Sequence, residues 1–164
     1  MYICGVNYES ICDGIGVRTT IFISGCLHNC FNCQSPDTHS FTYGSPVTSD
    51  MISMINEEMD KRTFLSGITL SGGDCMYSPT ETISLIKKLH IPKNNIWCYT
   101  GFQFEEVVKN PNRYSLLKLV DVLVDGLYVD ALRDITLPFR GSSNQRVIDV
   151  RASLKTGRII LLDI

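Results

Sequence analysis

The 164-residue sequence lacks several features that would place it in a broad functional class. It has no apolar run near the ~20 residues that a membrane-spanning helix needs, so we expect no membrane association. Its formal net charge is only −2, which argues against direct nucleic-acid binding. The N-terminal residues show no basic region followed by an apolar signal core, which predicts a cytoplasmic location.

The sequence also lacks the residue sets of common hydrolytic active sites. Its three histidines, His28, His39 and His90, are scattered, and no Ser/His/Asp or paired-carboxylate set accompanies them. We therefore predict surface or packing roles for the histidines. Any catalysis is expected to depend on bound cofactors, with no catalytic side chains beyond the cofactor sites.

Cysteine, in contrast, is abundant, with seven residues in the chain. An odd number fits a disulfide framework poorly, and in a reducing compartment metal binding explains the thiols better. Three of them form Cys26-x3-Cys30-x2-Cys33, directly after the segment 18–25, whose β-branched residues and final glycine predict a buried strand. No second cysteine run exists, as a two-cluster ferredoxin would need. The scattered cysteines are Cys4, Cys12, Cys75 and Cys98.

Three explanations fit three thiols at this spacing. They could be unrelated buried thiols, because free cysteine packs as a small hydrophobic residue. They could form a zinc site completed by His28 or His39, because zinc usually takes four ligands. They could hold a [4Fe–4S] cluster, which normally takes one thiolate per iron and would here keep one iron open for a substrate. We favour the cluster, because buried thiols seldom gather in one polar loop.

Short apolar segments alternate with helical patterns along most of the chain, which predicts an α/β fold. Further strands are expected near 67–70, 96–100, 121–126, 146–150 and 158–162, although 146–150 could instead open a short helix toward Lys155. Helices are expected near 49–62, 79–91, 102–109 and 113–120. There are too few units for a closed barrel, which usually needs ~250 residues. The sequence therefore predicts an open partial (β/α) barrel of mainly parallel strands, with residues 1–164 forming a single domain.

In such a sheet the chemistry lies at the carboxyl ends of the strands. Ser71-Gly72-Gly73-Asp74 follows a strand there, and Asp74 can accept a hydrogen bond from an ammonium group. An ordinary strand-to-helix turn is the alternative. Asp13-Gly14-Ile15-Gly16-Val17-Arg18 precedes a strand and so does not match a phosphate-binding loop. Arg18 is either structural or faces an anionic partner.

Six motifs together, in this order, give a specific resemblance. They are Asp13-Gly14-x-Gly16-x-Arg18, the cysteine motif, Ser71-Gly72-Gly73-Asp74, Tyr99-Thr100-Gly101, the segment 121–126 and the segment 140–146. From about Tyr8 onward the chain resembles the anaerobic ribonucleoside-triphosphate reductase activating proteins. That family consists of small glycyl-radical-enzyme activases of the radical S-adenosylmethionine (SAM) superfamily, and the resemblance implies a radical-SAM type of fold.

The resemblance implies a role for each matching position. Cys26, Cys30 and Cys33 would ligate a [4Fe–4S] cluster. Residues close to the adenine of SAM would be Asn32, Cys33 and Gln34. Residues holding the methionine ammonium would be Gly72, Gly73 and Asp74. The rest of the SAM cleft would be lined by Thr100, Asp125 and the segment Ser142 to Asn144.

The resemblance also implies the reaction and the partners. A flavodoxin-like electron donor would reduce the cluster, SAM would be cleaved, and the resulting radical would take hydrogen from a glycine near the C-terminus of an anaerobic ribonucleoside-triphosphate reductase. The alternatives are an activase of another glycyl-radical enzyme, a radical-SAM enzyme acting on a small molecule, and a zinc-stabilised binding module. Three positions depart from the pattern: Asn32 stands where many radical-SAM proteins carry an aromatic residue, Cys75 where activases often have proline, and Ile15 where proline is common.

Overall fold

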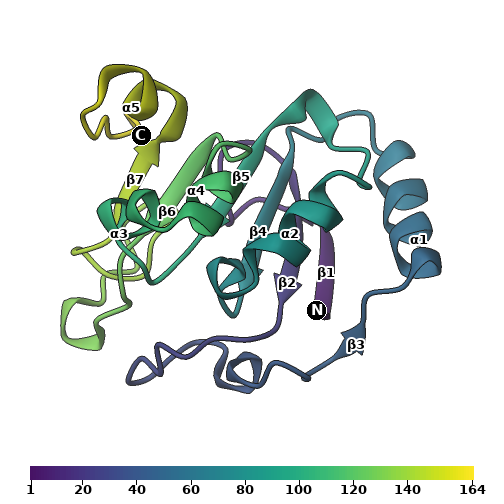
Figure 1. Cartoon of the computed structure of the whole chain (residues 1–164), viewed down its shortest axis with the longest axis horizontal. Coiled ribbons are helices and arrows are strands. Elements are labelled where there is room, and N and C mark those ends of the chain that lie inside the picture. Colours follow the sequence, from purple (N-terminus) through teal and green to yellow (C-terminus); the bar gives the residue numbers. More distant parts are fainter.

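The computed structural model describes all 164 residues, which build one seven-stranded sheet and five α-helices (Figure 1). The strands lie in the order β3-β1-β2-β4-β5-β6-β7. Their bounds are β1 Tyr2–Ser10, β2 Arg18–Ile23, β3 Ser45–Pro46, β4 Ile68–Gly72, β5 Ile96–Tyr99, β6 Val122–Asp125 and β7 Arg146–Asp149. The helices are α1 Ser49–Asp60, α2 Pro79–Ile86, α3 Phe104–Lys109, α4 Pro111–Leu117 and α5 Val150–Thr156.

The sheet is mixed, so the prediction of an open partial (β/α) barrel of mainly parallel strands is wrong. Only the central strands β2, β4, β5 and β6 run parallel to one another. At one side β1 pairs antiparallel with both β2 and β3, and at the other β7 pairs antiparallel with β6. The α/β class is correct, but the sheet is an open one with antiparallel edges.

Connection lengths explain why the edges are antiparallel. Residues 11–17 alone join β1 to β2, and a parallel crossover needs a dozen or more residues. The connection from β6 to β7 is longer, but it contains only the short 3₁₀ helix η4, Asp130–Leu132, which cannot serve as a crossover helix. The strand predicted at 158–162 is also wrong: Leu161 makes only an isolated bridge to Ile148.

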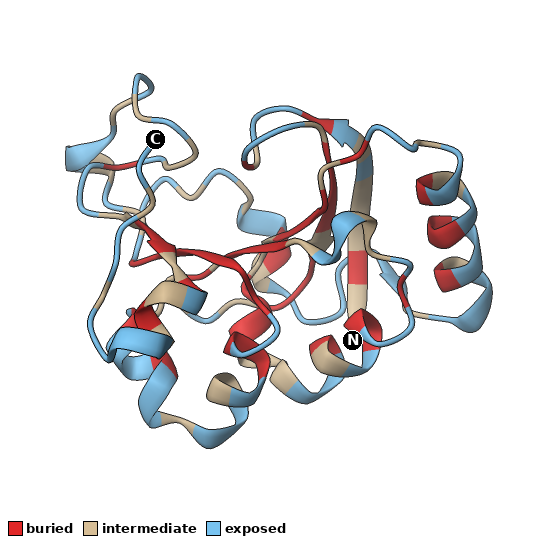
Figure 2. Ribbon diagram, turned by 90° about the horizontal axis from the view of Figure 1, so that it is seen from above, coloured by how far each residue is buried: buried red, intermediate tan, exposed pale blue.

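The two faces of the sheet are covered differently. One face carries Ile21, Leu70, Cys98 and Leu123 and packs in a cluster of 24 buried residues with side chains from the helices. The other face carries a smaller cluster around Trp97, against which Phe139 and Leu162 pack from irregular segments. In Figure 2 the buried residues follow the curved sheet and the inner sides of the helices. None of the helices has the length and apolar character that crossing a bilayer requires.

Local signals explain several helix boundaries. The side-chain oxygen of Thr48 accepts a hydrogen bond from the Met51 amide at 3.2 Å, which caps α1. Proline at the first position begins α2, and although Ser78-Pro79-Thr80-Glu81 has the sequence of a capping box, the Ser78 side chain makes no capping hydrogen bond. Asn110 ends α3 and caps α4 with its side chain, which separates the two helices as predicted.

Candidate functional site

Three chain segments meet at the carboxyl ends of β2 and β4. The Gly25 amide donates to the Thr38 carbonyl at 2.8 Å, and the Cys26 amide donates to the His39 carbonyl at 3.3 Å. On the other side, the Asp74 amide donates to the Gly25 carbonyl at 2.9 Å. The cysteine loop is therefore held between the segment 38–39 and the loop after β4. In Figure 1 the irregular segment that follows β2 runs along the lower edge of the molecule.

A cavity of about 260 Å³ opens at this junction, and Cys26, Cys30 and Cys33 all line it. The three thiols are free and half-buried. Burial raises the pKa of Cys26 to about 11 and raises the pKa of Cys30, against the lowering effect of nearby backbone amides. The Ser35 amide donates to the Cys33 sulfur at 3.4 Å. Binding a cationic centre would favour the thiolate form of these side chains.

The donor set of the cavity fits a [4Fe–4S] cluster. Three thiols from one loop face the same space, with backbone amides close to each of the sulfurs. No group of three or more His, Cys, Asp and Glu side chains in the chain is arranged to hold a single metal ion. A cluster does not need such convergence, because each of its thiolates ligates a different iron.

The loop after β4 is packed so closely that it requires glycine. Gly72 has a φ of 99°, a left-handed conformation that other residues rarely adopt. A Cβ on Gly73 would lie 2.8 Å from the Gly25 carbonyl oxygen and 2.9 Å from that of Thr38. Both glycines line the cavity, so their bare backbone is open to a ligand there.

Asp74 lies in the same loop with only 2% of its surface exposed, and its carboxylate joins three segments. Oδ2 accepts hydrogen bonds from Thr100 Oγ1 at 2.8 Å and from the Gly101 amide at 3.0 Å, and it contacts His28 Nε2 at 2.8 Å. Oδ1 accepts one from the Met76 amide at 2.9 Å. Asp74 thus fixes the loops after β4 and β5 against the cysteine loop.

His28 has a part in the site that the sequence did not reveal. It lies between Cys26 and Cys30, and only 11% of its side chain is exposed. Besides Asp74, it contacts the Tyr77 hydroxyl at 3.4 Å and packs edge-on against the Phe102 ring, with centroids 4.5 Å apart. The packing role predicted for His28 is correct, but its contact with Asp74 was missed because 46 residues separate the two.

The other two histidines differ from each other. His90 is exposed and pairs with Asp60 at 3.0 Å, as a surface residue does. His39 lines the cavity, and its Nε2 atom is buried without a hydrogen-bond partner. From the sequence, His39 is expected only as a zinc ligand or as a surface or packing residue, because its place in the cavity depends on how the segment 36–39 folds back onto the cysteine loop.

The residues predicted to contact SAM divide into three groups. Gln34, Gly72, Gly73, Asp74 and Thr100 line the cavity together with the cysteines. Asp125 and Asn144 line an adjacent cavity of about 460 Å³ that shares Gly101 and Gly126 with the first. The remaining two, Asn32 and Ser142, line neither cavity.

The residues outside the first cavity have clear structural contacts. Asn32 is exposed, and its side chain donates to Asp130 Oδ2 at 3.0 Å. The Ser142 hydroxyl accepts a hydrogen bond from the Val129 amide at 3.2 Å, which fixes the segment after β6. Asp125 is buried, caps the Phe104 amide at 2.7 Å and pairs with Arg146, whose pKa it raises.

Several cavity residues were not predicted. Most of them come from loops whose position depends on tertiary contacts, while Ser71 lies in β4 and Tyr99 ends β5. They are His28, Ser35, Thr38, His39, Ser71, Tyr99, Gly101, Gly126, Tyr128, Gly141 and Gln145.

Comparison with known proteins agrees with this geometry. Residues 12–148 match the family described as "4Fe-4S single cluster domain". Proteins named "Anaerobic ribonucleoside-triphosphate reductase-activating protein" from Salmonella typhi and Escherichia coli K12 are 37% identical over 146 residues, covering 86% of this chain and 94% of the relative. One of the same name from Enterobacteria phage T4 is 34% identical over 151 residues, covering 87% of this chain and 93% of the relative.

The chain belongs to the anaerobic ribonucleoside-triphosphate reductase-activating protein family. The resemblance inferred from the six motifs is therefore confirmed. The part that matches the 4Fe-4S single cluster domain contains every residue that lines the 260 Å³ cavity. Membership of the activating-protein family thus supports the iron–sulfur explanation of the three thiols over the zinc one.

Proposed function

We propose that the protein activates an anaerobic ribonucleoside-triphosphate reductase by generating a glycyl radical on it, with a [4Fe–4S] cluster and SAM as cofactors. The observation that carries the proposal is that Cys26, Cys30 and Cys33 line one cavity together with the glycine loop after β4. The family supports the reductase as partner, because the relatives are named for activating it. Residues 1–164 would act as one radical-SAM domain in the cytoplasm.

In this proposal the protein binds and orients its cofactors. The thiolates of Cys26, Cys30 and Cys33 hold the cluster, and the Ser35 amide stabilises the negative charge on the Cys33 sulfur. When bound and reduced by a flavodoxin-like donor, the cluster supplies the electron that cleaves SAM into methionine and the radical that takes hydrogen from glycine. The protein needs no acid–base pair of its own for this.

The loops after β4 and β5 would hold SAM. The backbone of Gly72 and Gly73 lines the cavity, and because the Gly73 amide already donates to the Ile23 carbonyl at 2.6 Å, it is the carbonyl groups of this loop that would accept hydrogen bonds from the ammonium of the methionine part. Asp74 keeps these loops in place, and its negative charge favours an ammonium group nearby. Gln34 and Thr100 line the remaining wall, while Asp125 and Asn144 border the adjacent cavity.

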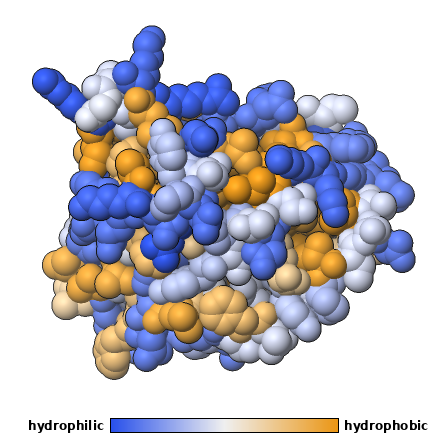
Figure 3. Space-filling view, viewed as in Figure 1, coloured by the Kyte–Doolittle hydropathy of each residue, from blue (hydrophilic) through white to orange (hydrophobic).

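The reductase would close the open side of the site. Exposed apolar side chains, including Leu127, Leu132 and Ile135, follow β6, and Leu127 lines the adjacent cavity. Figure 3 shows hydrophobic side chains gathered at the lower left, where the segment after β6 lies in Figure 1. Docking of a glycine-bearing segment of the reductase here would exclude water from the radical.

The test is to mix the reduced, reconstituted protein with SAM and the reductase of the same genome under anaerobic conditions. We expect an electron paramagnetic resonance doublet from a glycyl radical, which disappears when the C-terminal glycine of the reductase is changed to alanine. A Cys30→Ala variant is the matched negative control. If no protein radical forms but SAM is cleaved when a small metabolite is added, the assignment is wrong.

A simpler measurement distinguishes an iron–sulfur activase from a zinc-stabilised binding module. Protein purified without oxygen should be brown and contain iron and sulfide. A colourless protein that contains zinc would contradict the proposal. Replacing the reductase by another glycyl-radical enzyme tests whether the protein is the activase of that enzyme instead, because only the true partner should acquire the radical.

A further inference from the structure

His39 is held rigidly beside the proposed cluster site. Its carbonyl oxygen accepts a hydrogen bond from the Cys26 amide at 3.3 Å, and the preceding Thr38 carbonyl accepts one from Gly25 at 2.8 Å. The Thr38 hydroxyl in turn donates to the Ser35 carbonyl at 2.6 Å. The backbone of His39 is thereby held against the cysteine loop.

The imidazole lines the cavity, and its Nε2 atom is buried with no hydrogen-bond partner. Only one other buried side-chain nitrogen or oxygen in the protein, Nε of Arg140, is unpaired. An unpaired buried polar atom destabilises the folded state, so such atoms commonly point to a missing partner. The other histidine of the cavity, His28, already pairs with Asp74.

We propose that His39 donates a hydrogen bond from Nε2 to a sulfur of the bound cluster and thereby raises the reduction potential of the cluster. This inference rests on the cluster of the proposed function. Cys26, whose amide pairs with the His39 backbone, is one of the proposed ligands, so the ring lies at the border of the cluster cavity. The reduced cluster carries one more negative charge than the oxidised one, and an N–H donor stabilises the reduced form more strongly.

His39 is not a ligand of the cluster in this proposal. A fourth ligand would occupy the open iron on which the proposed SAM binding depends. The cavity also shows no arrangement of His39 with the cysteines that could hold a single ion. His39 is therefore a positioned donor to the cluster and not one of its ligands.

The experiment compares three variants after anaerobic reconstitution. His39→Phe and His39→Met remove the donor, whereas His39→Gln keeps an N–H group. His90→Gln is the matched control, because His90 is exposed and far from the cysteines in the fold. The iron content and the midpoint potential, from a redox titration followed by electron paramagnetic resonance, are measured for each protein.

We expect all variants to keep the iron content of the wild type. The potential should move to more negative values in His39→Phe and His39→Met, less in His39→Gln, and not at all in His90→Gln. An unchanged potential in both donor-free variants would overturn the inference, and so would loss of iron from all three His39 variants, which would make His39 a ligand. If the wild type itself takes up no cluster, the proposed function fails instead.

Discussion

Each of the three cavity thiols should be necessary for cluster binding. Replacing Cys26, Cys30 or Cys33 by alanine removes one of three proposed ligands that line the same cavity. We expect each variant to lose most of its iron, from about four per chain in the wild type, and to lose SAM cleavage. Cys12→Ala is the control, because Cys12 is exposed and outside that cavity. Near wild-type SAM cleavage in any one of the three variants would remove that residue from the ligand set.

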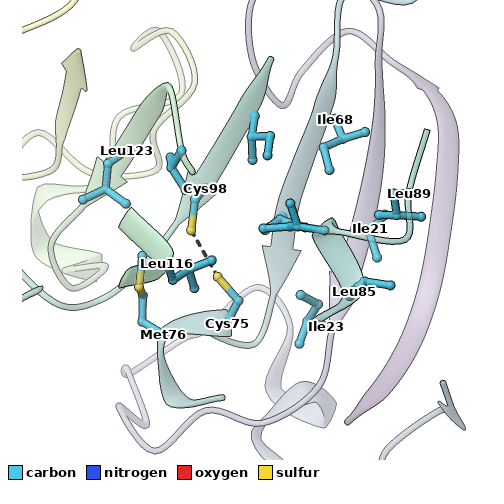
Figure 4. Close-up of a cluster of buried hydrophobic side chains, with 14 of the residues drawn as sticks. Ile21, Ile23, Ile68, Cys75, Met76, Leu85, Leu89, Cys98, Leu116 and Leu123 are labelled. Carbon is cyan, nitrogen blue, oxygen red and sulfur yellow. Dashed lines mark hydrogen bonds between the residues drawn. The ribbon is translucent and has the colours of Figure 1, made fainter. Parts of the chain in front are cut away.

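The buried thiols of Cys75 and Cys98 should not be ligands. Their sulfur atoms face each other 3.1 Å apart within the core, where Figure 4 shows them among Leu116, Leu123 and Met76. Mutual hydrogen bonding and burial raise the pKa of Cys75, which keeps it in the thiol form. We expect Cys75→Ser and Cys98→Ser to retain the iron content and to lose about 1 kcal/mol of folding stability. Iron analysis and urea unfolding measure the two effects, and iron loss in Cys75→Ser would contradict the assignment.

Asp74 should affect both SAM binding and the shape of the site. Asp74→Ala removes the charge that favours an ammonium group and also the acceptor for Thr100 and Gly101. A hydrogen bond to a charged group is worth roughly 1.5–3 kcal/mol, so the SAM affinity should fall by roughly tenfold or more. Thr100→Ala removes one hydrogen bond but leaves the charge, and it should weaken SAM binding less. Equal SAM affinity for Asp74→Ala and wild type would leave Asp74 with a structural role only.

At the scale of the elements, the caps explain where helices begin. Thr48→Ala removes the side-chain acceptor of the Met51 amide at the start of α1. The free energy of unfolding should fall by about 1 kcal/mol. Ser49→Ala, one residue further along α1, makes a suitable control because the Ser49 side chain makes no capping hydrogen bond. A loss of equal size in both variants, measured by urea unfolding, would show that the cap contributes nothing specific.

The elements also show what a sequence can and cannot predict. The central strands and α1 to α4 were predicted, because β-branched runs, turn residues and helical spacing are local signals. The strand β1 was missed because its residues are mostly half-exposed or exposed, so no strong apolar pattern marks it. One antiparallel edge is formed by β1, which was missed, and the other by β7, whose direction depends on how residues 126–145 return to the sheet. The sequence therefore led to a barrel-like sheet where an open mixed one forms.

For the site, the sequence predicted which loops meet but not how they are joined. Cys26, Gly73 and Thr100 each follow a strand of the parallel centre, and this topology brings such loops to one edge. The contact of His28 with Asp74 and the place of His39 depend on side chains from distant segments. No local pattern encodes such contacts, so they appear only in the folded chain.

On the scale of the whole molecule, structural and chemical residues lie at opposite ends of the parallel strands. Arg18, at the start of β2, is 1% exposed and donates to Thr69 Oγ1 at 2.9 Å and to the Ile68 carbonyl at 2.6 Å. Its guanidinium lies 5.4 Å from the Trp97 ring centroid, and burial lowers its pKa to about 10. These contacts give Arg18 a structural role and leave no room for an anionic partner.

Replacing Arg18 should therefore affect stability and not the cofactor site. Arg18→Met leaves the buried Thr69 hydroxyl and Ile68 carbonyl of β4 without their donor. The free energy of unfolding should therefore fall by about 1–3 kcal/mol for each buried group that loses its partner. Urea unfolding should show this loss, while the iron content and the SAM affinity of the folded fraction stay at wild-type values. Arg151→Met, whose side chain is 75% exposed, is the control for loss of an arginine charge. Loss of iron from the folded Arg18→Met variant would show that the Arg18 end of the parallel strands is coupled to the cofactor site at their carboxyl end.

The hydrogen bonds that join Gly25, Thr38, Asp74 and Gly101 also set an order of events during protein synthesis. Cys26, Cys30 and Cys33 leave the ribosome well before the segments that enclose them. The pocket around the thiols cannot close until translation has passed Gln145, the last residue that lines it, and that segment has emerged. Nascent chains stalled before this point should thus expose three unprotected thiols.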